Sequence, residues 1–369
     1  MRISDFHALY MAGKSWLSGS NPYVNLQAHT NFAYPPASLP FFGMFTIFDF
    51  NLATQLWVFT YVSLFAVALL ALALTLKGER RYLYVSIAVL LFLVSFPLQM
   101  LLELGQIDLL VANLTIMSLV VERLKRHSVS AVFLSIATLL KGPAVFLLIY
   151  FVIFRRDLKY LVHFTFSTFV IVGASLLVVP IKLYWFYLVN VLPTLYSEYS
   201  LGESQSIVRV LYLAGLNEPT LQAISVAGFV LLAIFAFCAN SNRWAKVFGK
   251  RTLRADAMFL MNVLIVLLLS PRSLISPYVW VILPVALFLS ALLVEDVRLA
   301  YLGVVGLAAF LVNSNPHPYF FFYLGMSVTI IPWMMIGNLM MTISLIPIYI
   351  RPNAIFRNVK SQLIHRRRI

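Results

Sequence analysis

Asp5 and the cations scattered among long apolar runs are the side chains whose types suggest chemistry. Asp5 stands in a short segment where Ile3, Phe6, Tyr10 and Leu17 recur at helical spacing. We expect this segment to form a helix in the membrane interface with its apolar face down. An acidic side chain held at a membrane surface suits a general base for an acceptor hydroxyl. The same carboxylate would also suit a plain helix N-cap, so both roles stay open.

Lys141 is expected to stop at membrane depth. The apolar stretch before it starts near residue 129, and Gly142-Pro143 breaks a helix directly after it. A helix of about 13 residues rises only about 20 Å, whereas the hydrocarbon core of a bilayer is about 30 Å thick. A cation held there needs an anion. Two partners stay open: a polyprenyl phosphate, or an internal ion pair with Glu103 or Asp108.

Glu103, Gln106 and Asp108 fall where a predicted outward span meets an inward one. Acidic groups at membrane depth are costly and usually face a cavity or a partner. We therefore expect these residues to line an acceptor cleft or to pair with a cation such as Lys141. A wet outer loop would explain them equally well.

Two arginines and one histidine on the same predicted side complete the polar set. Arg209 follows Ser204-Gln205-Ser206, and Arg272 stands in a short predicted turn. Guanidinium groups bind phosphate oxygens in bidentate fashion, although an arginine near a membrane surface also serves as a snorkelling anchor. His317 lies between two prolines, which fits either a cleft residue or a plain turn.

The elements that must position these residues are membrane helices. The chain is 62% hydrophobic and only 11% charged, with a mean hydropathy of +0.91, whereas soluble domains carry about 25% charged residues. The apolar runs are continuous rather than alternating, so helices rather than an outer-membrane barrel are expected. We predict an all-α polytopic fold of about 11 spans, forming one domain over residues 1–350. The runs cover about residues 51–76, 83–102, 108–121, 161–180, 221–240, 258–270, 277–294, 299–312 and 326–350, with one further stretch interrupted at Lys141 that counts as two.

Basic residues predict the orientation of these spans. When sides alternate, all but six of the 27 Lys and Arg residues fall on one side, which the positive-inside rule makes cytoplasmic. The exceptions are Arg2, Lys14, Lys141, Lys182, Arg209 and Arg272. We predict a multi-pass cell-membrane protein with an extracytoplasmic active site, an outer loop over residues 1–50 and a basic cytoplasmic tail over residues 351–369. No signal peptide precedes Asp5 to carry that outer loop across, so we expect a first transmembrane helix to be missing upstream.

Several function classes are excluded. The net charge of +14 sits mainly in short loops between apolar runs, so no nucleic-acid partner is expected. Cys238 is the one cysteine, which excludes an internal disulfide and a cysteine-based zinc site. Neither a Walker A motif nor a GxGxxG motif occurs, so no ATP-driven pump or bound dinucleotide is indicated. No carboxylate cluster with ligand spacing appears, and we expect neither a metal nor a cofactor.

One long pattern resembles the first outer loop of glycosyltransferase family 87. The members of this family are polyprenol-phosphate-mannose-dependent mannosyltransferases of the GT-C class. The pattern is Asp5…Tyr10-x-Ala12-Gly13…Gly19-x-Asn21-Pro22-Tyr23…Phe32-x-Tyr34-Pro35-Pro36. Four later motifs follow in the family's order: Gly105-Gln106-Ile107-Asp108, Leu140-Lys141-Gly142-Pro143, Ser204-Gln205-Ser206 and Ser270-Pro271-Arg272-Ser273. The chain departs from the family in two places, because residues 273–278 lack a histidine and Asp108 stands where Asn is common.

The resemblance implies a membrane enzyme that transfers a hexose from a polyprenyl-phosphate donor, with mannose as the first candidate for the hexose. The acceptor would be a hydroxyl of a glycolipid, glycan or glycoprotein at the outer face, with inversion and with membrane lipids as surroundings. Asp5 matches the catalytic carboxylate, and a helix would precede it. Donor phosphate contacts are expected from Lys141, Arg209 and Arg272. A substrate cleft is expected from Tyr10, Tyr34, Glu103, Gln106, Asp108, Gln205 and His317.

Two rival functions stay open. A transporter or flippase of an anionic lipid or polyprenyl carrier would explain a broken helix and a buried Lys141 equally well. It would not explain the aromatic, proline-rich outer segment with its acidic residue. A catalytically inactive homologue acting as a subunit is the second rival.

Overall fold

The structure is a computed structural model that describes residues 4–24, 32–195, 204–239, 251–270, 273–295, 297–314, 333–350 and 355. Every regular element in these ranges is helical, which confirms the all-α class. The helices in chain order are α1 (Ser4–Leu17), η1 (Pro36–Ser38), α2 (Leu39–Gly43), η2 (Met44–Ile47), α3 (Phe50–Leu74), α4 (Glu79–Val94), α5 (Phe96–Leu104), α6 (Asp108–Arg123), α7 (His127–Leu140), η3 (Gly142–Leu147), η4 (Ile149–Phe154), α8 (Leu158–Leu176), α9 (Ile181–Phe186), η5 (Tyr187–Val191), α10 (Leu192–Leu195), α11 (Ile207–Leu213), α12 (Glu218–Ala239), α14 (Arg251–Leu269), η6 (Ser276–Val281), α15 (Ile282–Leu293), α16 (Leu299–Asn313), α18 (Trp333–Leu345) and α19 (Pro347–Ile350).

Five helical segments in the described ranges are long and apolar enough to cross a membrane, or six if the bent pair α4–α5 counts as one span. The predicted count of about 11 is therefore not confirmed. The main reason is helix length, because several of the predicted spans form helices that are too short to cross a membrane alone. These shorter apolar helices include His127–Leu140, Gly142–Phe154, Leu299–Asn313 and Met334–Ile350.

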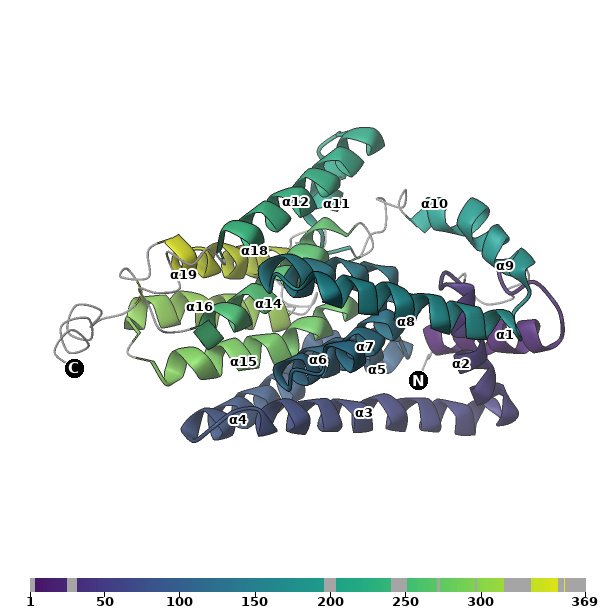
Figure 1. The fold of residues 1–369 in the computed structure, drawn as a ribbon, viewed down its shortest axis with the longest axis horizontal. Helices are drawn as coiled ribbons and strands as arrows, with labels where there is room; N and C mark the ends of the chain where they lie inside the picture. Colours follow the sequence, from purple (N-terminus) through teal and green to yellow (C-terminus); the bar gives the residue numbers. More distant parts are fainter. Residues whose placement is uncertain are drawn as a thin grey trace, which may run out of the picture.

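The long helices divide into central and peripheral ones. The spans Thr252–Leu269 and Ser276–Leu293 are 83% and 89% buried, whereas α8 and α12 are each only 17% buried. Figure 1 shows α3 running along the length of the molecule, with α1 and α2 at one end of it and the turn to α4 at the other. Asp49 begins α3 by accepting hydrogen bonds from the backbone of Asn51 and Leu52 at 2.9 and 3.1 Å.

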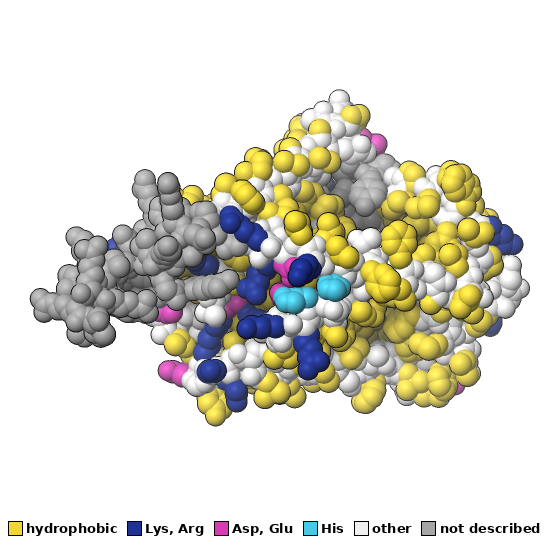
Figure 2. Space-filling model, viewed as in Figure 1, with side chains coloured by type: hydrophobic (Ala, Val, Ile, Leu, Met, Phe, Trp, Pro, Cys, Tyr) yellow, Lys and Arg dark blue, Asp and Glu magenta, His cyan; other side chains and the backbone are white. Residues whose placement is uncertain are grey.

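The outer surface of the peripheral helices suits lipid. Phe166 and Phe169 on α8 and Leu231 on α12 are each at least 65% exposed, and Figure 2 shows hydrophobic side chains over much of this face. Lys and Arg side chains gather on one part of the same face beside histidine side chains (Figure 2). Such a division between an apolar surface and a basic zone is typical of membrane proteins.

Two arginines at helix ends have a structural role. Asp256 on α14 is almost fully buried and forms ion pairs with Arg80 on α4 and Arg123 on α6. Two arginines around one carboxylate leave a net positive charge at the junction of three helices. Arg80 and Arg123 therefore join α4 and α6 to α14.

The predicted helix at Asp5 is present, but its apolar face packs against protein. Phe6 stacks on Trp57 of α3 with ring centroids 5.1 Å apart, and Leu9 and Ala12 are also buried. At Gly13, α1 crosses α2 so closely that an added Cβ would lie 2.9 Å from the backbone nitrogen of Gly43. Part of the face predicted to meet lipid therefore packs on α2 and α3, whereas Leu17 at its end is exposed.

Candidate active site

The turn between α5 and α6 is the centre of the candidate site. Gly105 ends α5 in the left-handed region at φ 71°, and its N–H donates to the Leu101 carbonyl at 2.8 Å. A side chain at this position would be strained, which explains the glycine. The Trp57 indole donates to the Gly105 carbonyl at 3.0 Å and so fixes the turn to α3.

One side of the turn contacts Asp5. The Gln106 side chain donates from Nε2 to Oδ2 of Asp5 at 2.5 Å, across 101 residues of sequence. Gln106 is 8% exposed, and Asp5 is half-buried in the first turn of α1. Two candidate site residues that sequence reasoning named separately are thereby brought into direct contact.

The other side of the turn contacts Lys141. Its Nζ lies 2.6 and 2.8 Å from the two carboxylate oxygens of Asp108. The Asp108 side chain is 1% exposed and that of Lys141 is 22% exposed. As predicted, the helix ends at this lysine, since α7 stops at Leu140 and Lys141 is extended before Gly142. Of the two partners considered for Lys141, the internal ion pair with Asp108 is present.

Helix η6 supplies two further donors to Asp108. Trp280 donates from Nε1 to Oδ1 at 3.2 Å, and Ser276 donates from Oγ to Oδ2 at 3.4 Å. A buried carboxylate is tolerated when its oxygens are paired in this way. Asp108 therefore joins three elements: α6, η6 and the end of α7.

The same η6 region holds the segment that precedes Arg209. The backbone N–H of Gln205 donates to the Ser273 carbonyl at 2.7 Å, and the Tyr278 hydroxyl donates to the Gln205 carbonyl at 2.8 Å. Ser206 begins α11 by accepting from the backbone N–H of Arg209 at 3.2 Å. Arg209 donates from Nη1 to the Ser204 carbonyl at 3.3 Å, while its buried Nε has no partner in the part of the chain that the structure describes.

A comparison with known families decides the class of protein. The profile of glycosyltransferase family 87 matches residues 32–271, well over half of the chain. The chain belongs to glycosyltransferase family 87. The match contains the 105–108 turn, Lys141 and Arg209, and it begins after Asp5. No curated protein matches the sequence.

Three other predicted cleft residues of this family 87 chain lie in different settings. Tyr10 is buried, and its hydroxyl donates to the Phe48 carbonyl at 2.9 Å, so that hydroxyl stabilises the fold. Tyr34 is half-buried among aromatic rings, and its carbonyl accepts from the Tyr23 hydroxyl at 2.8 Å. Glu103 is exposed near the end of α5. Arg272 and His317 lie outside the described residues.

Sequence reasoning missed Ser276, Tyr278 and Trp280. Each bonds to a predicted site residue at least 73 positions away in sequence, and no local spacing reveals such pairs. A partial signal was present, because a buried indole N–H needs an acceptor and a buried aspartate needs donors. Trp280 is 3% exposed and satisfies both needs at once.

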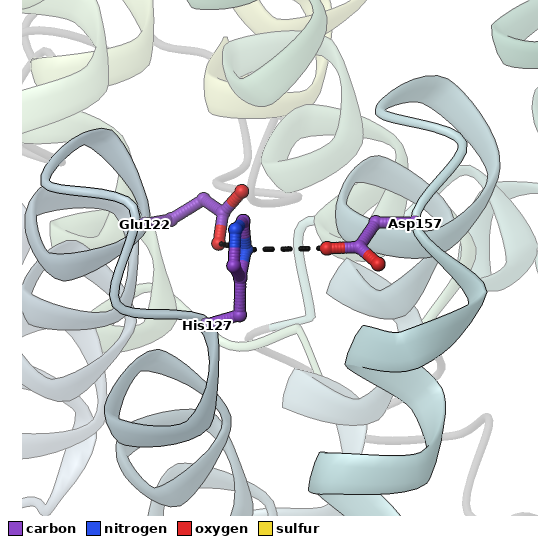
Figure 3. Close-up of side chains that lie close together, drawn as sticks. All are labelled: Glu122, His127 and Asp157. Carbon is purple, nitrogen blue, oxygen red and sulfur yellow. Dashed lines mark hydrogen bonds and ion pairs between the residues drawn. The ribbon is translucent and has the colours of Figure 1, made fainter.

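A second polar cluster of the family 87 chain lies away from this site. His127 Nδ1 is 2.7 Å from Glu122 Oε2 and 3.1 Å from Asp157 Oδ2 (Figure 3). Burial raises the pKa of Glu122, and the neighbouring His127 and Arg155 oppose that rise. The three donor atoms lie within 4.8 Å of one another, close enough to surround a cation. Sequence spacing did not reveal this cluster, because Asp157 comes from the turn before α8.

The cluster and the candidate site occupy opposite ends of α6. Asp108 begins this helix and Glu122 stands in its last turn, which separates them by about 21 Å at 1.5 Å per residue. The cluster is therefore no part of the arrangement around Gln106 and Lys141.

Proposed function

We propose that this family 87 glycosyltransferase transfers a hexose from a polyprenyl-phosphate donor to an acceptor hydroxyl, with mannose as the first candidate for the hexose. The observation that carries the proposal is the 105–108 turn, which contacts the Asp5 carboxylate through Gln106 and Lys141 through Asp108. A potential base and a potential phosphate-binding cation thus flank one short turn in the matched region. A transferase needs both groups, whereas a transporter needs no base.

In the proposed reaction, Asp5 takes the proton of the acceptor hydroxyl. The resulting oxygen nucleophile attacks the anomeric carbon while the bond from that carbon to the phosphate oxygen breaks. The polyprenyl phosphate leaves with the bonding electron pair, and a single displacement inverts the anomeric centre. Cations stabilise the charge that develops on the leaving phosphate.

Arg209 and Lys141 are the cations proposed for the phosphate. The unpartnered buried Nε of Arg209 supports this role, because an unsatisfied buried donor costs free energy and an anion would relieve it. Lys141 retains an exposed fraction of 22% despite its ion pair, which leaves an N–H direction for a second anion. Arg272 is proposed as a third cation on the resemblance alone.

The proposed site faces the outside of the cell membrane, with the C-terminus in the cytoplasm. The distribution of Lys and Arg over the predicted loops supports this orientation. An outer site has no access to cytoplasmic nucleotide sugars, which favours a donor carried by lipid. A glycolipid, glycan or glycoprotein would then supply the acceptor hydroxyl.

Substitution of the proposed base tests this mechanism. Asp5→Asn keeps the size of the side chain but removes the charge that takes up a proton, so turnover should fall by about 10² to 10⁴-fold. The assay follows label from polyprenyl-phosphate mannose to octyl mannoside as acceptor probe, per folded molecule in detergent. Asp49→Asn is the matched control, because Asn also caps α3 there. Turnover of Asp5→Asn within about threefold of the parent would exclude Asp5 as the base.

A further inference from the structure

We infer that Gln106 is a positioning residue that holds the Asp5 carboxylate, and that it is not a substrate contact. This inference rests on the proposed role of Asp5. The amide of Gln106 already donates to Asp5 at 2.5 Å, and only 8% of the residue is exposed. Little of its side chain is therefore left to meet a sugar.

An amide suits this task chemically. Its N–H donates to an ionised carboxylate but has no proton to give up at ordinary pH, so the base stays ready to accept one. A lysine or arginine at the same place would hold the carboxylate through a full positive charge and would weaken it as a base. The neutral amide fixes the orientation of the Asp5 carboxylate and weakens it less as a base than a cation would.

The backbone beneath Gln106 is fixed on both sides. Before it, the Gly105 carbonyl accepts from Trp57; after it, Asp108 accepts from Lys141, Trp280 and Ser276. The backbone N–H of Gln106 itself donates to the Leu101 carbonyl at 3.3 Å. A side chain mounted on such a turn sets the position of its partner with little freedom.

The contact also joins two elements that share one support. Phe6 of α1 stacks on Trp57 of α3, and the same Trp57 donates to Gly105 in the turn between α5 and α6. The Gln106–Asp5 bond then relates the first turn of α1 directly to that turn. Small errors in this relation matter, because misplacing a catalytic group by about 1 Å costs about 10²-fold in rate.

The test is a double-mutant cycle in the full chain, with polyprenyl-phosphate mannose as donor and octyl mannoside as acceptor probe. Gln106→Ala should lower kcat by about 10²-fold and leave both KM values within about threefold. In the Asp5→Asn background, Gln106→Ala should have no further effect, because a positioning residue acts only through the group it positions. Gln99→Ala on exposed α5 surface is the control and should match the parent.

Gln106→Asn is the second variant, in case the alanine change impairs folding. It keeps a buried amide but is one methylene shorter, about 1.5 Å, so it too should lower kcat. A rise in KM as the main effect of either variant, or an equal loss of kcat in the parent and the Asp5→Asn background, would overturn the inference while leaving Asp5 as base. Full activity of Asp5→Asn alone would instead refute the proposed role of Asp5 as the base, on which the inference rests.

Discussion

At the scale of residues, two carboxylates flank one turn and have different surroundings. Asp108 accepts from an ammonium, an indole and a hydroxyl, all from other elements. Asp5 accepts from the neutral amide of Gln106. We interpret Asp108 as a structural anchor, since a carboxylate surrounded by donors is a poor base, and keep Asp5 as the proposed base.

A pair of substitutions separates the two roles open to Lys141. Lys141→Met should leave Asp108 buried without its cation and lower stability by about 3 kcal/mol, as for other broken buried pairs. Adding Asp108→Asn should recover most of that loss. If Lys141 also binds donor phosphate, the KM for polyprenyl-phosphate mannose stays raised in the double variant. Recovery of the parental donor KM together with stability, measured by melting and kinetics, would leave Lys141 a purely structural role.

The break at Lys141 could be predicted from sequence, because Gly142-Pro143 cannot continue a helix. The sequence narrows the partner of Lys141 to Glu103, Asp108 or a phosphate, but it does not decide among these three. The choice depends on Ser276 and Trp280, which stand 168 and 172 residues from Asp108 and stabilise its charge. Similarly, Asp5 and Gln106 were both named as site residues, but their contact across 101 residues was not foreseeable.

At the scale of elements, the close crossing of α1 and α2 depends on Gly13. A Cβ there would lie 2.9 Å from backbone atoms of Phe42 and Gly43. Gly13→Ala should therefore lower stability by about 1–3 kcal/mol, the usual cost of overpacking. Gly173→Ala on α8 is the control, because an added Cβ there meets nothing within 4 Å. Equal melting temperatures for the two variants would contradict the packing of α1 on α2.

The Glu122–His127–Asp157 cluster should make stability depend on pH in a defined direction. Burial raises the pKa of Glu122 above its ordinary value of 4.5 in the folded chain. The folded state therefore favours the protonated carboxyl, and this contribution to stability is lost as pH rises through the folded pKa. Relative to Glu122→Gln, the parent should therefore lose stability as the pH rises above the ordinary value of 4.5. Melting curves in which the parent gains on the variant as the pH rises would contradict this sign.

Hydropathy predicts that the elements are helices, but it does not predict how many of them span the membrane. Composition shows where a segment is apolar, but not whether it forms one long helix or several short ones. The 57° bend between α4 and α5 illustrates this, because one apolar run gives two helices at Ser95-Phe96. Likewise, the sequence does not reveal that α2 and α3 cover Phe6 and Tyr10 of α1.

At the scale of the whole molecule, orientation in the membrane can be tested by labelling. In a Cys238→Ser background, which removes the exposed native thiol, single cysteines replace exposed Lys77 or exposed Ala214. The positive-inside rule predicts that the first resists an impermeant thiol reagent in intact cells and the second reacts. Reaction at Lys77→Cys but not at Ala214→Cys would reverse the proposed orientation and place the candidate site inside.

The identity of the sugar donor tests the central claim most directly. The purified chain, in liposomes with octyl mannoside as acceptor probe, is offered either polyprenyl-phosphate mannose or a nucleotide-linked mannose without lipid carrier. Family 87 membership and a candidate site that joins Asp5, Gln106, Asp108 and Lys141 predict transfer from the lipid-linked donor, with release of polyprenyl phosphate. Asp5→Asn should abolish most of that transfer. Efficient transfer from the nucleotide sugar alone, unaffected by Asp5→Asn, would contradict the account.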